Sequence, residues 1–187
     1  QDAPDIGQLG GEFSNLPLIL VGAGPSLDES IDFLKAARSH AIIACSNSSY
    51  RKLVNSGVKP HLTVSADPLS PTLQGYLKTS SDGVWLAAPF SAYPPVVKRF
   101  AGRVLTWTTN NPVMDIIRYR GDRQPGTPIL EQGTVSACIL DIARVFGCPK
   151  VLLVGQDMAL KSDGQYYTND SVYADSGTHY AEYTRAQ

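Results

Sequence analysis

Short apolar runs alternate with helix-length segments along the chain, and this alternation constrains the fold more than any other feature. The run Leu18–Val21 is continuously apolar, as expected for a strand that is buried on both faces. Five further runs have the same character, at 41–44, 61–65, 84–88, 103–108 and 151–154. Strands that alternate with helices predict βαβ units with right-handed crossovers. We therefore expect an α/β fold, Rossmann-like, with three αβα layers around a mostly parallel sheet.

The helical segments between these runs show where functional groups should lie. Leu27, Ile31 and Leu34 fall about one turn apart, and the segment from Val135 has the same period until it stops at Gly147. Sheets of this kind bind ligands outside the carboxyl ends of their strands. We therefore expect the binding and catalytic residues at the corners where a strand leads into a helix.

Composition excludes several classes of protein. The chain has 187 residues, a net charge of −1 and 43% apolar residues, which predicts one globular domain and argues against a nucleic-acid-binding protein. No apolar run approaches the ~20 residues that a membrane span needs, and no secretory signal pattern opens the chain. Its three cysteines form no CxxC pair, so we expect reduced thiols and a cytoplasmic location.

The two ends of the chain differ from its centre. Residues 1–15 are polar without a period and predict a flexible lead-in, whereas 16–160 predict a Rossmann-like domain that binds a nucleotide-sugar. Residues 161–187 hold five of the nine tyrosines and no helical or strand pattern. We interpret them as a tail that folds over the site as a lid, or as part of a truncated region.

The strongest candidate site is the glycine-containing corner after the first strand. Gly22 and Gly24 would allow a ligand to approach the backbone closely. Ser26 and Glu29 have the spacing of a capping box, which predicts a helix that begins at Ser26 with free N–H groups for a phosphate. The alternative is a capped turn without a ligand. Leu27 stands where a dinucleotide fingerprint needs its third glycine, so NAD and FAD are not expected.

Four other corners place polar side chains after a strand. Asn47 could contact a base or ribose, or it could cap the next helix. Asp67 could cap a helix, or bind a hydroxyl, a base or a divalent ion. Thr134 and Ser136 begin the best helix of the chain and could bind an anion or only cap it. Asp157 places a second carboxylate at a strand tip, and we expect Asp67 and Asp157 to lie near the ligand among the catalytic residues.

His179 is the histidine that best fits a catalytic role. It lies in the tyrosine-rich tail, where a neutral imidazole could accept a proton from an attacking hydroxyl. The alternative is a solvent-exposed histidine. The tail tyrosines could instead donate hydrogen bonds to a leaving phosphate.

Taken in order, the motifs resemble a known group of proteins. The resemblance covers about Leu16 to Leu160 and rests on 22–27 (GAGPSL), Asn47, 65–67 (SAD), 132–136 (QGTVS) and 154–157 (VGQD). These motifs resemble the central domain of bacterial motility accessory factors, held to glycosylate flagellin with nonulosonic, sialic-acid-like sugars. The same domain is similar to an archaeal hydroxymethylpterin pyrophosphokinase group. Its first and last motifs are also similar to bacterial sialyltransferases that use CMP-activated sugars.

The resemblance implies a role for most candidate residues. It places at the nucleotide phosphate the residues Gly22, Gly24, Pro25 and Ser26. It places near the cytidine or its ribose the residues Asn47, Thr134 and Ser136. Asp67 and Asp157 match acidic positions without a fixed role, and His179 matches no motif.

Three functions remain open at this point. The first is transfer of a nonulosonic sugar from a CMP donor to flagellin or another protein, with no metal or cofactor required. The second is pyrophosphoryl transfer from ATP to a pterin, with Mg²⁺ held by Asp67 or Asp157. The third is a nucleotide-binding domain without catalytic activity.

Overall fold

The six strands in the described residues belong to one parallel sheet. The computed structural model describes residues 3–109, 126–130, 133–162 and 164–173. The strand order is β5-β4-β3-β2-β1-β6, and every neighbouring pair is parallel. The strands are β1 (Leu18–Val21), β2 (Ile42–Ser46), β3 (Leu62–Val64), β4 (Trp85–Pro89), β5 (Val104–Trp107) and β6 (Val151–Val154). The predicted α/β class and the six predicted strand runs are confirmed.

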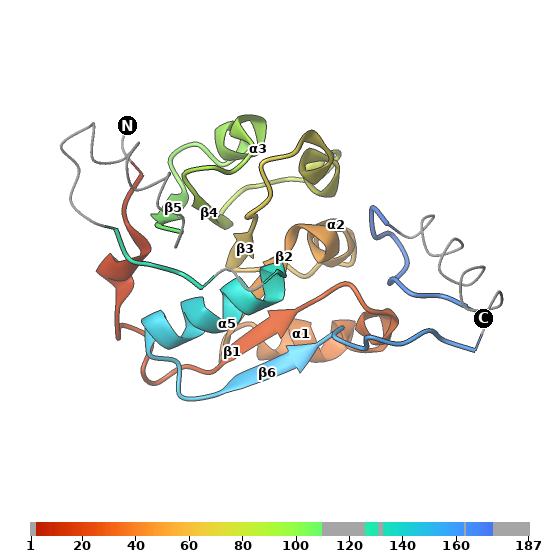
Figure 1. The fold of residues 1–187 in the computed structure, drawn as a ribbon. Coiled ribbons are helices and arrows are strands. Elements are labelled where there is room, and N and C mark those ends of the chain that lie inside the picture. The colour runs from red at the N-terminus through yellow and green to blue at the C-terminus, as the bar shows by residue number, and fades with distance from the viewer. Residues whose placement is uncertain (1–2, 110–125, 131–132, 163, 174–187) are drawn as a thin grey trace.

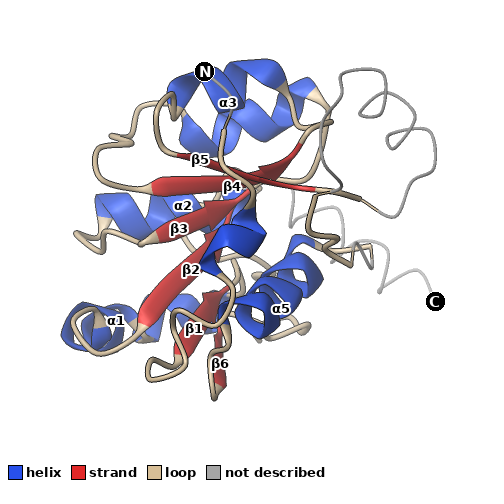
Figure 2. Ribbon diagram, turned by 90° about the vertical axis from the view of Figure 1, so that its left-hand side faces the viewer, coloured by secondary structure: helices blue, strands red, loops and turns tan. Residues whose placement is uncertain are grey.

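Helices cover both faces of the sheet, as Figures 1 and 2 show. They comprise α-helices and 3-10 helices, the latter labelled η. In chain order they are η1 (Ile6–Leu9), η2 (Pro25–Glu29), α1 (Ile31–Ala37), α2 (Asn47–Asn55), η3 (Ser70–Tyr76), α3 (Pro94–Arg99) and α5 (Val135–Phe146). Core residues of α1, α2, η3 and α3 pack on one face, and those of α5 and η1 pack on the other. This arrangement is the predicted three-layer fold.

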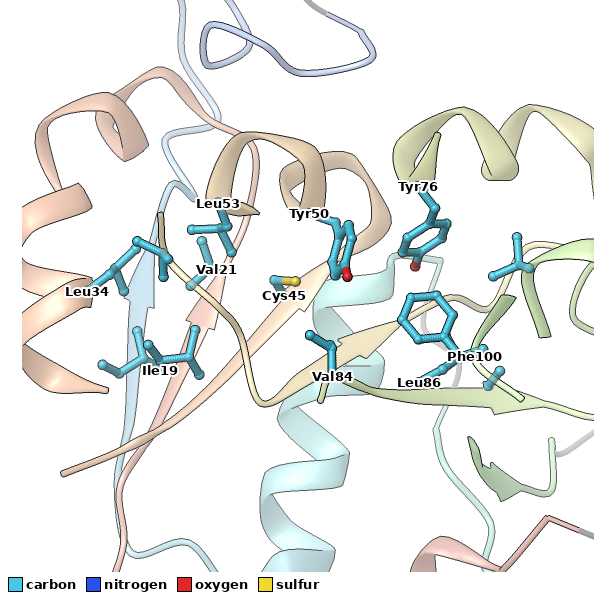
Figure 3. Close-up of a cluster of buried hydrophobic side chains, with 14 of the residues drawn as sticks. Ile19, Val21, Leu34, Cys45, Tyr50, Leu53, Tyr76, Val84, Leu86 and Phe100 are labelled. Atoms are coloured by element: carbon cyan, nitrogen blue, oxygen red, sulfur yellow. The ribbon is translucent and has the colours of Figure 1, made fainter. Parts of the chain in front are cut away.

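The core is continuous through the central strands. Ile19 packs into the layer of α1 and α2, and Leu18 packs into the layer of α5, because successive side chains of a strand point to opposite faces. In the first layer the rings of Tyr50, Tyr76 and Phe100 pack against one another (Figure 3). Their centroids are 5.0 to 6.0 Å apart. These contacts anchor α2, η3 and α3 against the sheet.

The strand order reverses direction at one point in the sheet. From β1 to β5 the strands follow one another in one direction, whereas β6 lies on the other side of β1. The helix that precedes β6, α5, accordingly covers the opposite face from α1, α2 and α3. In open α/β sheets the ligand crevice forms where the order reverses, outside the carboxyl ends of the strands. Here that point lies between β1 and β6.

The N-terminal segment is more ordered than its composition predicts. Ile6 is fully buried against α5, and Asp5 accepts hydrogen bonds from the N–H groups of Gly7 at 2.9 Å and Thr127 at 3.0 Å. Phe13 packs against Phe146 of α5, and the N–H groups of Gly11 and Phe13 donate to carbonyls at the end of α5. None of these contacts produces a periodic pattern in the sequence. None of the helices in the described ranges is long and apolar enough to cross a membrane.

Candidate functional site

At the reversal point the glycine corner packs against the turn that follows β6. The N–H of Gly22 donates to the carbonyl of Val154, and that of Gly24 donates to the carbonyl of Gly155, each at 2.8 Å. A Cβ on Gly22 or Gly24 would collide with atoms of the turn 155–157. The close approach that these glycines permit is therefore to the protein's own chain.

The carboxylate of Asp157 lies directly at this corner. Its Oδ2 accepts hydrogen bonds from the Ser26 hydroxyl at 2.9 Å and from the Ser26 N–H at 3.3 Å. The predicted capping box is wrong, because the Ser26 hydroxyl binds Asp157 and the helix begins one residue earlier, at Pro25. Asp157 thus accepts hydrogen bonds from the Ser26 N–H and hydroxyl groups, which were expected from the sequence to bind a phosphate.

The first turn of α5 flanks the same turn from the other face of the sheet. The Gln156 side-chain amide donates to the Ser136 hydroxyl at 2.9 Å. Thr134 caps α5, because its hydroxyl accepts from the N–H of Ala137 at 3.2 Å. The structure therefore brings Ser136 and the 155–157 turn together. Gln156 is a site residue that sequence reasoning missed, although it lies inside the VGQD motif.

Asn47 lies at the next strand end and is the first residue of α2, whose N-cap is Ser46 rather than Asn47. The residue is 9% exposed. The neighbouring Ser49 hydroxyl donates to the carbonyl of Val21 at 2.8 Å, which ties the start of α2 to the end of β1. The start of α2, and Asn47 with it, therefore lies beside the end of β1 that leads into the glycine corner.

Asp67 lies at the same edge but far from Asp157. It is exposed, and its carboxylate accepts from the N–H of Leu69 at 2.8 Å, so it caps the turn before η3. Three strand spacings separate β3 from β6, which corresponds to roughly 14 Å. Asp67 and Asp157 therefore cannot ligate one ion together, although both were expected near the ligand. An extended ligand could reach both. No cluster of three metal-binding side chains occurs in the described ranges.

A segment near the C-terminal end of the chain closes over this edge. We call residues 164–173 the strap; in Figure 1 it is the blue segment beyond the arrowhead of β6. The N–H of Thr168 donates to the carbonyl of Ala23 at 2.7 Å, and its hydroxyl donates to Asp28 at 2.7 Å. Asp28 also forms an ion pair with Lys52 at 2.6 Å. These contacts hold the strap against the glycine corner.

The electrostatics of Asp28 favour its charged form. Burial alone would raise its pKa, but the hydrogen bonds from Lys52, Thr168 and Asn169 outweigh burial and hold the pKa below its ordinary value. Asp28 is therefore a charged anchor. Sequence reasoning missed it because a charged residue on a helix is usually solvent-exposed.

The strap makes a second set of contacts with α2. Arg51 donates to the carbonyls of Asp170 at 2.9 Å and Ser171 at 3.1 Å, and the Ser171 hydroxyl donates to the carbonyl of Ser48 at 3.3 Å. The rings of three half-buried strap tyrosines pack together, with centroid distances of 4.8 and 5.5 Å, namely Tyr166, Tyr167 and Tyr173. His179 lies outside the described residues.

Comparison with known proteins agrees with this fold. The structure of a MAf glycosyltransferase from Magnetospirillum magneticum AMB-1 is similar, with a TM-score of 0.68 and 20% identity over 80% of this chain and 24% of that one. A mutant CE4-family pseudoenzyme with restored activity covers 76% of this chain and 66% of its own at 13% identity, and its TM-score of 0.27 is too low to indicate a shared fold. No curated protein matches the chain.

The chain therefore spans about a quarter of the length of the MAf glycosyltransferase it resembles. A family model described as 6-hydroxymethylpterin diphosphokinase MptE-like matches residues 1–163. This match confirms the resemblance seen in the sequence motifs. Because it covers most of the chain, the protein belongs to the 6-hydroxymethylpterin diphosphokinase MptE-like family.

Proposed function

We propose that this chain is a glycosyltransferase domain that takes a sialic-acid-like sugar from a CMP donor and transfers it to a hydroxyl group of a protein such as flagellin. The fold it shares with the MAf glycosyltransferase supports this class of reaction. The observation that carries the choice of donor is the Asp157 carboxylate, which lies on the glycine corner and accepts from Ser26.

A carboxylate at this corner discriminates between phosphate ligands by their charge. Two like unit charges about 6 Å apart repel by roughly 3 kcal/mol at an effective dielectric constant of about 20. A CMP-sugar carries one phosphodiester charge, whereas the triphosphate of ATP carries several. The repulsion from Asp157 therefore weighs much more heavily on ATP, unless a cation offsets it.

The same carboxylate has a use in sugar transfer. When the bond between the anomeric carbon and the phosphate oxygen breaks, its electron pair leaves with CMP and the sugar develops positive charge. A carboxylate near that carbon stabilises the positive charge, while the N-terminus of α5 stabilises the departing phosphate. In this arrangement Asp157 lies beside the sugar, and Thr134 and Ser136 lie beside the phosphate.

The remaining candidates fit the same placement of the donor. The Asn47 amide would contact the cytidine or its ribose, and Gly22–Ser26 would border the phosphate. The acceptor hydroxyl needs a base, and we propose His179 or Asp67 for that role. The two buried thiols among the three free cysteines are consistent with a protein that works in the cytoplasm.

The family assignment favours a second candidate, transfer of a diphosphate group from ATP to a pterin. That reaction must neutralise a polyphosphate, so it would require Mg²⁺. Since Asp67 and Asp157 end strands three positions apart in the sheet, only one of them could hold a given ion. Loss of Mg²⁺ or of that carboxylate would abolish this activity.

Calorimetry with CMP and ATP, each with Mg²⁺ and with EDTA, separates the two functions. We expect CMP to bind with similar affinity in both conditions and more tightly than ATP. Asp157→Asn should strengthen ATP binding more than CMP binding, whereas the exposed Asp32→Asn should change neither. Loss of CMP binding on chelation, or much tighter binding of ATP with Mg²⁺, would favour the pterin diphosphokinase instead.

A further inference from the structure

The side chain of Gln156 joins the glycine corner to the first turn of α5. On one side its amide nitrogen donates to the Ser136 hydroxyl at 2.9 Å. On the other side the amide lies against Gly22, where a Cβ would collide with the amide nitrogen and carbon. Gln156 therefore contacts both the end of β1 and the start of α5, beside the point where the strand order reverses.

The residues on either side of Gln156 hold its backbone in place. Gly155 accepts from the N–H of Gly24 at 2.8 Å. Asp157 accepts from the Ser26 hydroxyl at 2.9 Å. Because both neighbours are bound to the glycine corner, the Gln156 amide is directed at α5 by the turn itself.

The direction of the bond to Ser136 determines what this serine can do. An amide NH2 group donates and does not accept, whereas a hydroxyl donates one proton and accepts through its lone pairs. When Ser136 accepts from Gln156, its own O–H proton stays available for another acceptor. A carboxylate at position 156 would reverse the bond, because a carboxylate can only accept.

We propose that Gln156 is a positioning residue that directs the O–H group of Ser136 toward a phosphate oxygen of the ligand. This inference rests on the proposed function, in which Ser136 lies beside the phosphate of the CMP donor. An O–H group that donates to an anionic oxygen forms a charge-assisted hydrogen bond. The Gln156 amide is neutral, so it orients the hydroxyl without adding a second negative charge next to Asp157.

Calorimetry with CMP on two Gln156 variants tests this role, each compared with wild type at the same pH so that titration of CMP cancels. Gln156→Leu removes the donor without adding charge, and CMP should bind about 5- to 20-fold more weakly at every pH. Gln156→Glu reverses the bond at neutral pH, and CMP should bind at least about 30-fold more weakly there.

The pH profile of Gln156→Glu separates positioning from packing. As the pH falls from about 7.5 to about 4.5, the carboxyl group beside Asp157 takes up a proton and can donate again. The affinity relative to wild type should then rise at least about 5-fold. The matched control is Gln8→Glu at an exposed glutamine of η1, which adds the same charge and should bind CMP as wild type does.

A double-mutant cycle tests whether Gln156 acts through Ser136. Ser136→Ala alone should weaken CMP binding about 10-fold, because the donor to the phosphate is lost. Adding Gln156→Leu to Ser136→Ala should change the affinity by less than about 2-fold. If Gln156→Leu does not fold, as judged by circular dichroism and a thermal melt, Gln156→Glu and its pH profile provide the test.

ATP with Mg²⁺ and inorganic pyrophosphate are titrated in parallel, so that the donor and the role of Gln156 are tested separately. If CMP fails to bind but one of these ligands binds with the same pattern across the variants, the CMP donor is wrong and the role of Gln156 stands. If CMP binds wild type, Gln156→Leu and Gln156→Glu equally, the role of Gln156 is wrong and the donor stands.

Two further results would overturn the inference. The first is additive losses in the double-mutant cycle, because Gln156 would then act independently of Ser136. The second is a Gln156→Glu variant whose relative affinity does not recover as the pH falls. Absence of binding by CMP, ATP and pyrophosphate alike would overturn both this inference and the proposed function.

Discussion

Removal of the Asp28 carboxylate should release the strap from the glycine corner while the rest of the fold persists. Asp28 accepts from Lys52 at 2.6 Å, from the Thr168 hydroxyl at 2.7 Å and from the Asn169 N–H at 3.3 Å. Hydrogen bonds to charged groups contribute about 1.5–3 kcal/mol each, but the freed ammonium and hydroxyl groups regain water. We therefore expect Asp28→Ala to lower the free energy of strap opening by about 2–3 kcal/mol.

Hydrogen exchange measured by mass spectrometry reads this change directly. A loss of that size corresponds to roughly 30- to 150-fold faster exchange of strap amides, including the Thr168 N–H that binds Ala23. The control is Asp32→Ala, because Asp32 is 99% exposed and its 3.8 Å ion pair with Lys35 is a surface contact. Unchanged strap exchange in Asp28→Ala, with a lower melting temperature, would show that Asp28 stabilises the helices rather than the strap.

The pH dependence of the strap follows from the same group. The pKa of Asp28 is lower in the folded protein than its ordinary value of 3.8. The contribution of Asp28 to the stability of the closed strap is therefore fully present above that ordinary pKa. It is lost as the pH falls through the pKa of Asp28 in the folded protein. The difference in strap opening between wild type and Asp28→Ala should be constant from pH 5 to 7 and should shrink below about pH 4.

Three further predictions concern stability and reactivity. Gly24→Ala should lower the free energy of unfolding by about 1–3 kcal/mol in urea denaturation, because its Cβ would meet the Asp157 carboxylate. The double variant with Asp157→Gly should lose less unfolding free energy than the sum of the losses of the two single variants. Asp141→Leu should cost about 1–3 kcal/mol in the same assay, because the buried carboxylate accepts the Leu130 N–H at 2.9 Å. The Cys45 thiol, whose pKa burial raises to about 12, should resist alkylation at pH 8 until the protein unfolds.

The sheet could be predicted from the sequence because each of its strands is a short, apolar run bounded by polar corners. β1 is buried along its whole length, which is what a continuous run such as Leu18–Val21 predicts for a strand with helices on both faces. The 3-10 helices could not be predicted in the same way. η1 is four residues long and depends on Ile6 and Asp5, which is too short for any period to show.

The site was predictable in its location more than in its contacts. Motifs at strand ends placed Gly22–Ser26, Asn47 and Asp157 at one edge, because parallel strands share that edge. The bonds between them depend on the strand order, which puts β6, the last strand along the chain, beside β1, the first. 

The hydrogen bond between Ser26 and Asp157 joins residues 131 positions apart, and no local pattern reports such a contact. The lid expected within residues 161–187 could not be given its contacts for the same reason, since Thr168 and Asp28 are 140 positions apart.

The contacts at the reversal point also determine how a ligand must enter. The Ser26 donors are satisfied by Asp157, and the Ala23 carbonyl is satisfied by the Thr168 N–H of the strap. A ligand that reaches the glycine corner must therefore replace hydrogen bonds that already exist, so its binding free energy is reduced by the cost of breaking them. A change that loosens the strap, such as Asp28→Ala, removes part of this cost. If the corner binds the proposed donor, we therefore expect binding and opening of the strap to be coupled, and each would favour the other to the same extent.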